Sequence, residues 1–151
     1  MSDASGAVAG FLLVRASGRL VGLPVEHLVA VAEFGDPHPV PSPEPALRGV
    51  AVVRGETMPV IHLGAFLAGT ACPAERGQAG VVITVDGGRL CLEVDEADVV
   101  VRAVTMPLPD TTVQAWARAV VRCPEGLVPL LDLTALGARL AGKEANDEHG
   151  R

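Results

Sequence analysis

Short runs of Val, Leu and Ile, each ended by Gly or Pro, recur along the chain and constrain its fold more than any other feature. Only 3% of the residues are aromatic and none is Tyr, so aliphatic side chains must fill the core. Val and Ile are stiff at χ1 and pack well on pleated sheets. A chain of 151 residues can bury such a core without disulfides or a metal. The pattern predicts an all-β protein.

The runs predict ten strands, because β-branched segments bounded by Gly and Pro are typical of strands. We expect them at residues 10–16, 19–25, 29–34, 48–54, 57–61, 80–85, 89–94, 98–104, 116–122 and 126–131. Short helices are expected at 63–68 and at 132–141, where Asp132 can cap the helix, with one further turn at 26–28. The Pro-rich segment 35–45 and the segment 70–80 are expected to be surface loops without regular structure.

The two halves of the chain resemble each other at an offset of about 70 residues. The tripeptide Gly18-Arg19-Leu20 recurs as Gly88-Arg89-Leu90. The segment 54–63, which contains Pro59, is echoed by 122–133, which contains Pro129. Two repeats of strands with one short helix each predict two packed β-barrels, since closing a sheet removes its exposed edges.

The charge distribution argues against two classes of partner. The net charge is −6 and no run of Lys or Arg occurs, so nucleic acid and anionic membrane surfaces are disfavoured. The apolar run near the N-terminus meets Arg15 too early to span a bilayer, so no direct membrane insertion is expected. We expect flexible tails at 1–9 and 142–151 around a domain at 10–141.

No catalytic, cofactor or metal motif is found. The histidines and cysteines lack metal-ligand spacing, and nucleotide-binding and nucleophile-elbow motifs are missing from the sequence. Asp86-Gly87-Gly88 is typical of a hairpin turn. An acidic cluster alternates along one strand end and is expected to be solvated: Glu93, Asp95, Glu96 and Asp98. The sequence therefore predicts neither an enzyme nor a metal or cofactor site, and its apolar body favours a protein that works through surfaces.

The segment 49–63, GVAVVRGETMPVIHL, resembles the signature of the CheW family of chemotaxis adaptors, in which Arg-Gly precedes a Pro, two apolar residues and Asp-Leu. GLPV at 22–25, LEVDE at 92–96 and LLDL at 130–133 resemble other family segments. The resemblance extends from Phe11 to Leu140. It implies two five-stranded SH3-like barrels, no cofactor, and an adaptor role without catalysis.

The resemblance also implies partners and a site. CheW-like proteins bind the cytoplasmic tip of a chemoreceptor and the regulatory domain of a CheA-type histidine kinase. The expected location is therefore cytoplasmic, with recruitment to membrane-associated receptor arrays. Carried over to this chain, the receptor groove comprises Leu28, Gly49, Arg54, Val81 and Val100. Val81 and Val100 can contribute only if they are exposed, and Arg54 either contacts the receptor or braces its own turn.

Two residues depart from the family signature. His62 replaces the usual Asp, and a neutral His is expected to cap the following helix poorly. Val52 stands where Asn is frequent. Three alternatives to a chemotaxis adaptor remain: a detached kinase regulatory domain, a coupling protein for pili, gliding or second-messenger control, and an enzyme or small-ligand barrel. The last would need a pocket with convergent polar groups.

Overall fold

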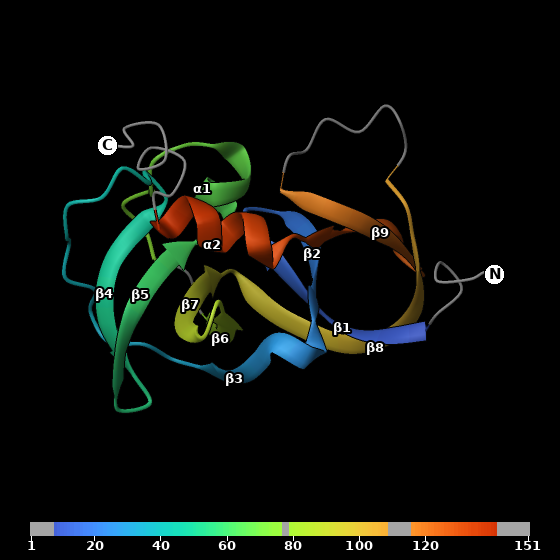
Figure 1. Cartoon of the computed structure of the whole chain (residues 1–151), viewed down its shortest axis with the longest axis horizontal. Coiled ribbons are helices and arrows are strands. Elements are labelled where there is room, and N and C mark those ends of the chain that lie inside the picture. Colours follow the sequence, from blue (N-terminus) through green and yellow to red (C-terminus); the bar gives the residue numbers. More distant parts are fainter. Residues whose placement is uncertain (1–7, 77–78, 109–115, 142–151) are drawn as a thin grey trace.

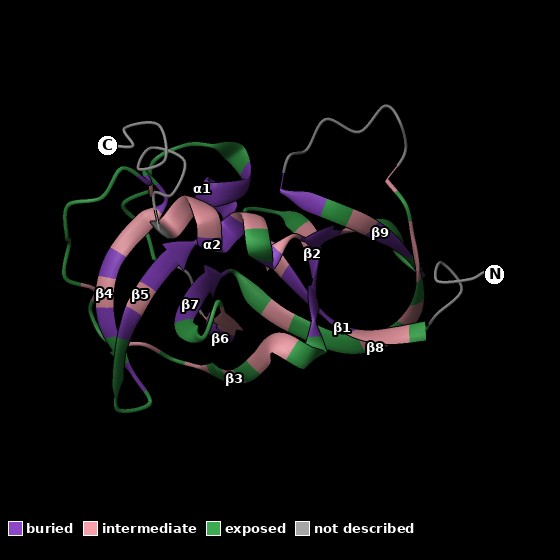
Figure 2. Ribbon diagram, viewed as in Figure 1, coloured by how far each residue is buried: buried purple, intermediate pink, exposed green. Residues whose placement is uncertain are grey.

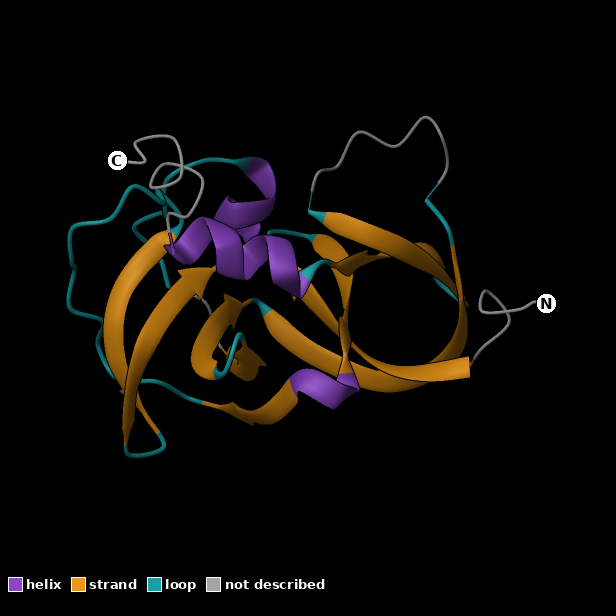
Figure 3. Cartoon of the chain, viewed as in Figure 1, coloured by secondary structure: helices purple, strands orange, loops and turns teal. Residues whose placement is uncertain are grey.

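The computed structural model describes residues 8–76, 79–108 and 116–141 (Figure 1). Its elements, in chain order, are β1 (Val8–Ala16), β2 (Arg19–Pro24), η2 (Val25–His27), β3 (Leu28–Ala32), β4 (Leu47–Val53), β5 (Glu56–His62), α1 (Leu63–Ala68), β6 (Ala79–Val85), β7 (Gly88–Val94), β8 (Glu96–Met106), β9 (Ala117–Cys123), β10 (Gly126–Leu131) and α2 (Leu133–Ala141). Strands dominate and the helices are short (Figure 3). The expected all-β class is confirmed.

The strands form two lobes of five strands each. The first lobe is a closed barrel with the order β1-β2-β10-β9-β8, and the second lobe has the order β3-β6-β7-β5-β4. The chain starts in the first lobe, builds the second from β3 to β7, and returns to the first with β8. The lobes are therefore joined by two chain crossings, one between β2 and β3 and one between β7 and β8.

The Pro-rich segment after β3 closes the second lobe. The backbone N–H of His38 donates to the Val50 carbonyl (2.8 Å), and the Val50 N–H donates to the His38 carbonyl (2.9 Å). Pro37 and Pro39 have no N–H, so His38 supplies the one backbone donor of the tripeptide. In the first lobe, Met106 pairs with Val120 at the corresponding position. The expectation of a loop without regular structure is therefore wrong at His38.

The internal repeat is visible in the topology. The strands β1, β2, β8, β9 and β10 of the first lobe correspond in order to β6, β7, β3, β4 and β5 of the second. In both lobes the single parallel pair lies at an equivalent place, β2 with β10 and β7 with β5. Each lobe therefore takes a hairpin from one half of the chain and three strands from the other half.

Three hairpins turn through two residues with positive φ, which is the backbone of a type I′ turn. These are Ser17-Gly18, Arg54-Gly55 and Asp86-Gly87, where φ is 53°, 52° and 52° at the first residue. The twist of such turns matches the right-handed twist of the flanking strands. The turn between β4 and β5 thus lies one residue earlier than expected, and Arg54 occupies it instead of ending β4.

Buried residues occur on strands of both lobes (Figure 2). The buried apolar side chains form three clusters. Alternating side chains of β1 go to two of them: Leu12 and Val14 enter the core shared by both lobes, while Phe11 and Leu13 fill the first barrel. In the second lobe, Val81 and Ile83 enter the shared core, and the inner core contains Ala51, Val53, Met58, Val60, Val82 and Cys91. The shared core is the largest and holds both lobes together.

Each helix contacts the hairpin turn of the other lobe. A Cβ at Gly64 of α1 would overlap the side chain of Ser17, in the turn of the first lobe. A Cβ at Gly137 of α2 would come within 2.6 Å of Val85, beside the Asp86 turn of the second lobe. Arg139 of α2 also forms a 2.7 Å ion pair with the buried Glu44. Glycine is therefore needed where each helix crosses to the opposite lobe.

Several element boundaries differ from expectation by one to three residues. The first strand begins at Val8, so residues 8–9 of the expected N-terminal tail belong to β1. Residues 1–7 and 142–151, which make up the rest of the expected tails, lie outside the described residues. Among the described residues, no helix has the length and apolar character needed to cross a bilayer.

Gly49 gives a test of how the second lobe closes. Its φ is +146°, and a Cβ there would overlap the His38 carbonyl. Gly55 also has a positive φ, +82°, but open space around it. Gly55→Ala should cost about 1–2 kcal/mol for left-handed backbone strain, and Gly49→Ala should cost roughly a further 1–3 kcal/mol for the overlap. Urea unfolding of the two variants measures this difference, and equal costs would contradict the close approach of His38.

Candidate interaction surface

The five residues expected to form the receptor groove differ in their exposure to solvent. Val81 is 0% exposed and lies in the shared core, so its side chain cannot contact a partner. Gly49 is buried beneath His38, where it allows two backbone segments to approach each other. These two assignments are corrected on that ground. Leu28 begins β3 and is half-buried, Arg54 is exposed in its turn, and Val100 on β8 is 59% exposed.

Exposed apolar side chains follow η2, β3 and β8, which lie along the lower side of the molecule in Figures 1 and 2. Both η2 and β8 contact β6, so this surface crosses the junction between the lobes. We call it the valine surface, and it comprises Val25, Val29, Val31, Val99, Val100 and Val104. Large exposed apolar patches often mark sites where a protein binds a partner.

A cleft of about 290 Å³ adjoins the valine surface where β3 and β4, the two outer strands of the second lobe, face each other. Its walls include apolar residues of the inner core, Val53, Met58 and Val82, together with Val29. Arg54 and Arg89 also line it. The cleft therefore combines an apolar lining with positive charge.

The two arginines of the cleft differ in their partners. Arg89 donates to Glu56 at 3.0 Å, so its charge is balanced within the chain. The side chain of Arg54 forms no hydrogen bond or ion pair with any residue that the structure describes. It does not brace its own turn, because the positive φ of Arg54 and Gly55 already sets the turn geometry. Arg54 is thus a cation on a rigid hairpin with its donors available.

A largely buried ion pair links β4 and β7 of the second lobe. The guanidinium of Arg48 contacts both carboxylate oxygens of Glu93, at 2.6 and 3.2 Å. Its remaining donors bind the carbonyls of Pro73 and Glu75 at 2.9 and 2.8 Å. Glu93 is only 1% exposed, so the expectation that it belongs to a solvated acidic cluster is wrong. A charged residue inside the apolar run Leu92-Glu93-Val94 was the one signal in the sequence of a buried partner.

His62 caps helix α1. Its Nδ1 accepts a 2.9 Å hydrogen bond from the backbone N–H of Ala65, so the expectation of a poor cap is wrong. Burial lowers the pKa of His62 below its ordinary value of 6.5, although the neighbouring Glu93 acts in the opposite direction and Arg48 reinforces it. The neutral imidazole is therefore favoured, and this is the form that has a ring nitrogen free to accept.

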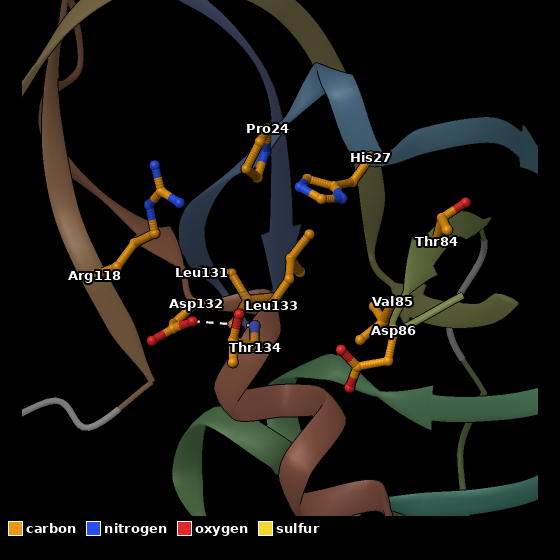
Figure 4. Close-up of a pocket in the computed structure, with 10 residues that line it drawn as sticks. All are labelled: Pro24, His27, Thr84, Val85, Asp86, Arg118, Leu131, Asp132, Leu133 and Thr134. Carbon is orange, nitrogen blue, oxygen red and sulfur yellow. Dashed lines mark hydrogen bonds between the residues drawn. The ribbon is translucent and has the colours of Figure 1, made fainter. Parts of the chain in front are cut away.

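A small pocket of about 110 Å³ lies between the lobes, next to the start of α2 (Figure 4). His27, Asp86 and Arg118 approach it from three different elements. Asp132, however, is engaged as the helix cap, because its Oδ1 accepts from the N–H groups of Thr134 and Ala135. The polar groups do not converge on one ligand atom in the way that a catalytic pocket requires.

The cysteines lack the features of nucleophiles. Burial raises the pKa of all three thiols, and the pKa of Cys91 reaches about 12. The reactive thiolate is therefore disfavoured at neutral pH. Within the described ranges, no group of three His, Cys, Asp or Glu side chains is placed to hold a metal ion.

Comparison with known proteins identifies the family of the chain. The CheW-like domain family matches residues 10–140. The chain belongs to the CheW-like family. Its fold is similar to the crystal structure of the scaffolding protein TtCheW from Thermoanaerobacter tengcongensis, with a TM-score of 0.74 and 18% identity over 86% of this chain and 92% of that one. No curated protein sequence matches the chain.

Membership decides the class of activity. CheW-like domains are non-catalytic scaffolds of chemotaxis signalling, so this chain is not an enzyme. The two five-stranded lobes agree with the SH3-like barrels that the resemblance implied.

The Arg48–Glu93 pair of this CheW-like chain should be destabilising when only one partner is removed. Arg48→Met leaves a carboxylate in a site from which water is excluded, and breaking a buried pair in this way costs about 3–5 kcal/mol. Replacing both, as in Arg48→Met with Glu93→Leu, should recover most of that loss. Urea unfolding of the single and double variants gives the coupling free energy. A double variant as unstable as the sum of the two single variants would contradict a direct pair.

The His62 cap predicts a pH dependence. The lowered pKa in the folded state means that the cap stabilises the protein above about pH 6.5 and is lost as pH falls through the folded value. His62→Asn provides the control, because its amide oxygen can accept the same bond without titrating. The stability of the wild type should therefore fall relative to His62→Asn as urea melts are repeated at lower pH. A constant difference would show that His62 does not titrate in this interval.

Proposed function

We propose that this chain is a coupling adaptor that binds the cytoplasmic tip of a chemoreceptor and the regulatory domain of a CheA-type kinase. Family membership supports the adaptor class, and the valine surface supplies an apolar contact area of the type that interfaces bury. The adaptor acts in the cytoplasm and is recruited to membrane-associated receptor arrays. It needs no cofactor for this role.

The receptor assignment rests on the exposure of the Arg54 side chain and on its lack of a partner among the described residues. A solvent-exposed guanidinium on a rigid turn, with no partner among the described residues, can make charge-assisted bonds to a receptor helix without losing a bond inside the chain. Leu28 begins β3 of the second lobe, beside Val29 of the Arg54 cleft, and Val100 lies on β8 of the first lobe. We therefore keep Leu28, Arg54 and Val100 as the receptor contact.

The alternatives differ in partner. A detached kinase regulatory domain would bind receptor and adaptor in place of receptor and kinase. A coupling protein for pili, gliding or second-messenger output would bind a receptor of another pathway through the same contact. Binding to the organism's own receptors and kinase, measured separately, distinguishes these alternatives.

Arg54→Ala tests the receptor contact. The substitution should weaken binding to a receptor-tip fragment by roughly 30-fold, which corresponds to about 2 kcal/mol, because an arginine of this kind can dominate a small interface. Its urea midpoint should stay at the wild-type value, since no bond inside the described chain is removed. Arg122→Ala, at an exposed arginine that precedes the corresponding turn of the first lobe, is the matched control.

The two measurements separate the possible outcomes. Unchanged affinity of Arg54→Ala for the receptor fragment, with a lowered urea midpoint, would make Arg54 a structural residue and remove the receptor assignment. Equal losses of affinity for Arg54→Ala and Arg122→Ala would show that the contact does not lie on the second lobe.

A further inference from the structure

Three charged side chains line the cleft of the second lobe: Arg54 and Glu56 from the β4–β5 hairpin, and Arg89 from β7. Glu56 pairs across the hairpin with Val53, whose side chain points into the inner core, so Glu56 lies on the same face of the sheet. Arg89 alternates with the buried Cys91 along β7 and therefore faces the same way. One carboxylate thus shares the cleft with two guanidinium groups.

The carboxylate of Glu56 contacts one of the two arginines. Its Oε1 accepts a 3.0 Å hydrogen bond from Nη1 of Arg89, and the side chains of this pair are each 49% exposed. Arg54, two residues before Glu56 in the hairpin, forms no such bond with any described residue. Because one carboxylate balances one positive charge, the bond to Arg89 leaves the charge of Arg54 unbalanced.

The first lobe closes without an equivalent charge pair. Gly126, the first residue after the β9–β10 turn, occupies the place of Glu56 in the repeat. Leu20, the second residue after the β1–β2 turn, occupies the place of Arg89. Neither residue is charged, so a lobe of this repeat can close without the pair, and exposed ion pairs contribute little to stability. The pair is therefore better explained by its effect on the cleft than by a role in folding.

Arg54 is the alternative partner of Glu56. The two residues flank Gly55 at the end of one hairpin, and both line the same cleft. A carboxylate that is not held elsewhere in the cleft is attracted to this guanidinium and occupies its donors. Such a pair inside the chain would compete directly with a carboxylate or carbonyl of a partner protein.

We propose that Arg89 holds Glu56 away from Arg54 and in this way keeps Arg54 unpaired for the receptor contact. Arg89 is then a positioning residue, which acts through Glu56 and does not itself contact the receptor. The inference deepens the proposed function and rests on it, because the proposed receptor contact uses the same Arg54.

Arg89→Gln tests the proposal in a binding titration against the receptor-tip fragment. The variant frees Glu56 to pair with Arg54, so the affinity should fall by about fivefold, which corresponds to roughly 1 kcal/mol. The double variant, Arg89→Gln with Glu56→Gln, also removes the competing carboxylate and should recover the wild-type affinity. A double variant as weak as Arg89→Gln would overturn the proposal, because Arg89 would then contact the receptor itself.

Two control variants separate the position of the charge from its amount. Arg89→Lys keeps a cation that can hold Glu56, and it should bind the fragment like the wild type. Arg15→Gln removes one positive charge from an exposed pair with Glu96, 3.6 Å apart on the first lobe, and should also leave the affinity unchanged. Equal losses for Arg15→Gln and Arg89→Gln would assign the effect to the net charge of the chain and overturn the proposal.

The mobility of the Arg54 side chain gives a measurement that needs no receptor. The heteronuclear NOE of its Nε–H group should be low in the wild type, higher in Arg89→Gln, and low again in the double variant. Equal values in the wild type and Arg89→Gln would overturn the proposal. A wild type that binds no receptor fragment, with Arg54 immobilised in Arg89→Gln, would remove the proposed function and leave the charge arrangement of the cleft intact.

Discussion

The shared apolar core is the constraint on which the rest of the structure depends. It is built from β1 and β2 of one lobe, β6 and β7 of the other, and both helices. Because each of these strands buries side chains on two faces, a lobe taken alone would leave one face of its best-packed strands in water. Aliphatic side chains make up most of this core, and Phe66 and Trp116 are its two large aromatic members. The valine surface is a consequence, because it crosses the junction where the two lobes meet.

Much of the fold could be predicted from local sequence signals. The type I′ turns have Gly at their second position, Asp132 marks the start of α2, and the ~70-residue repeat predicts two similar lobes. The closure of the second lobe was less accessible. His38 is surrounded by prolines that argue against pairing, and its bridge to Val50 depends on where β4 passes in three dimensions.

The site could be predicted less well than the fold. Arg54 was proposed from its motif, and its side chain forms no hydrogen bond or ion pair with the described residues. Val81 could not be classified, because a valine in a strand has the same sequence signature whether it faces the core or solvent; here it is in the core. Arg48 and Glu93 lie 45 residues apart, so only the fold reveals that they neutralise each other. The cap by His62 required knowing that burial favours its neutral form.

The order of the strands along the chain has a consequence for synthesis on the ribosome. All five strands of the second lobe are contiguous, from Leu28 to Val94, so this lobe can assemble as soon as β7 has emerged. The hairpin of β1 and β2 emerges earlier but finds its partner strands β8, β9 and β10 only near the end of translation. The strands that are synthesised first, β1 and β2, therefore belong to the barrel that is completed last. The nascent chain therefore exposes an apolar hairpin without its partner strands for most of its synthesis.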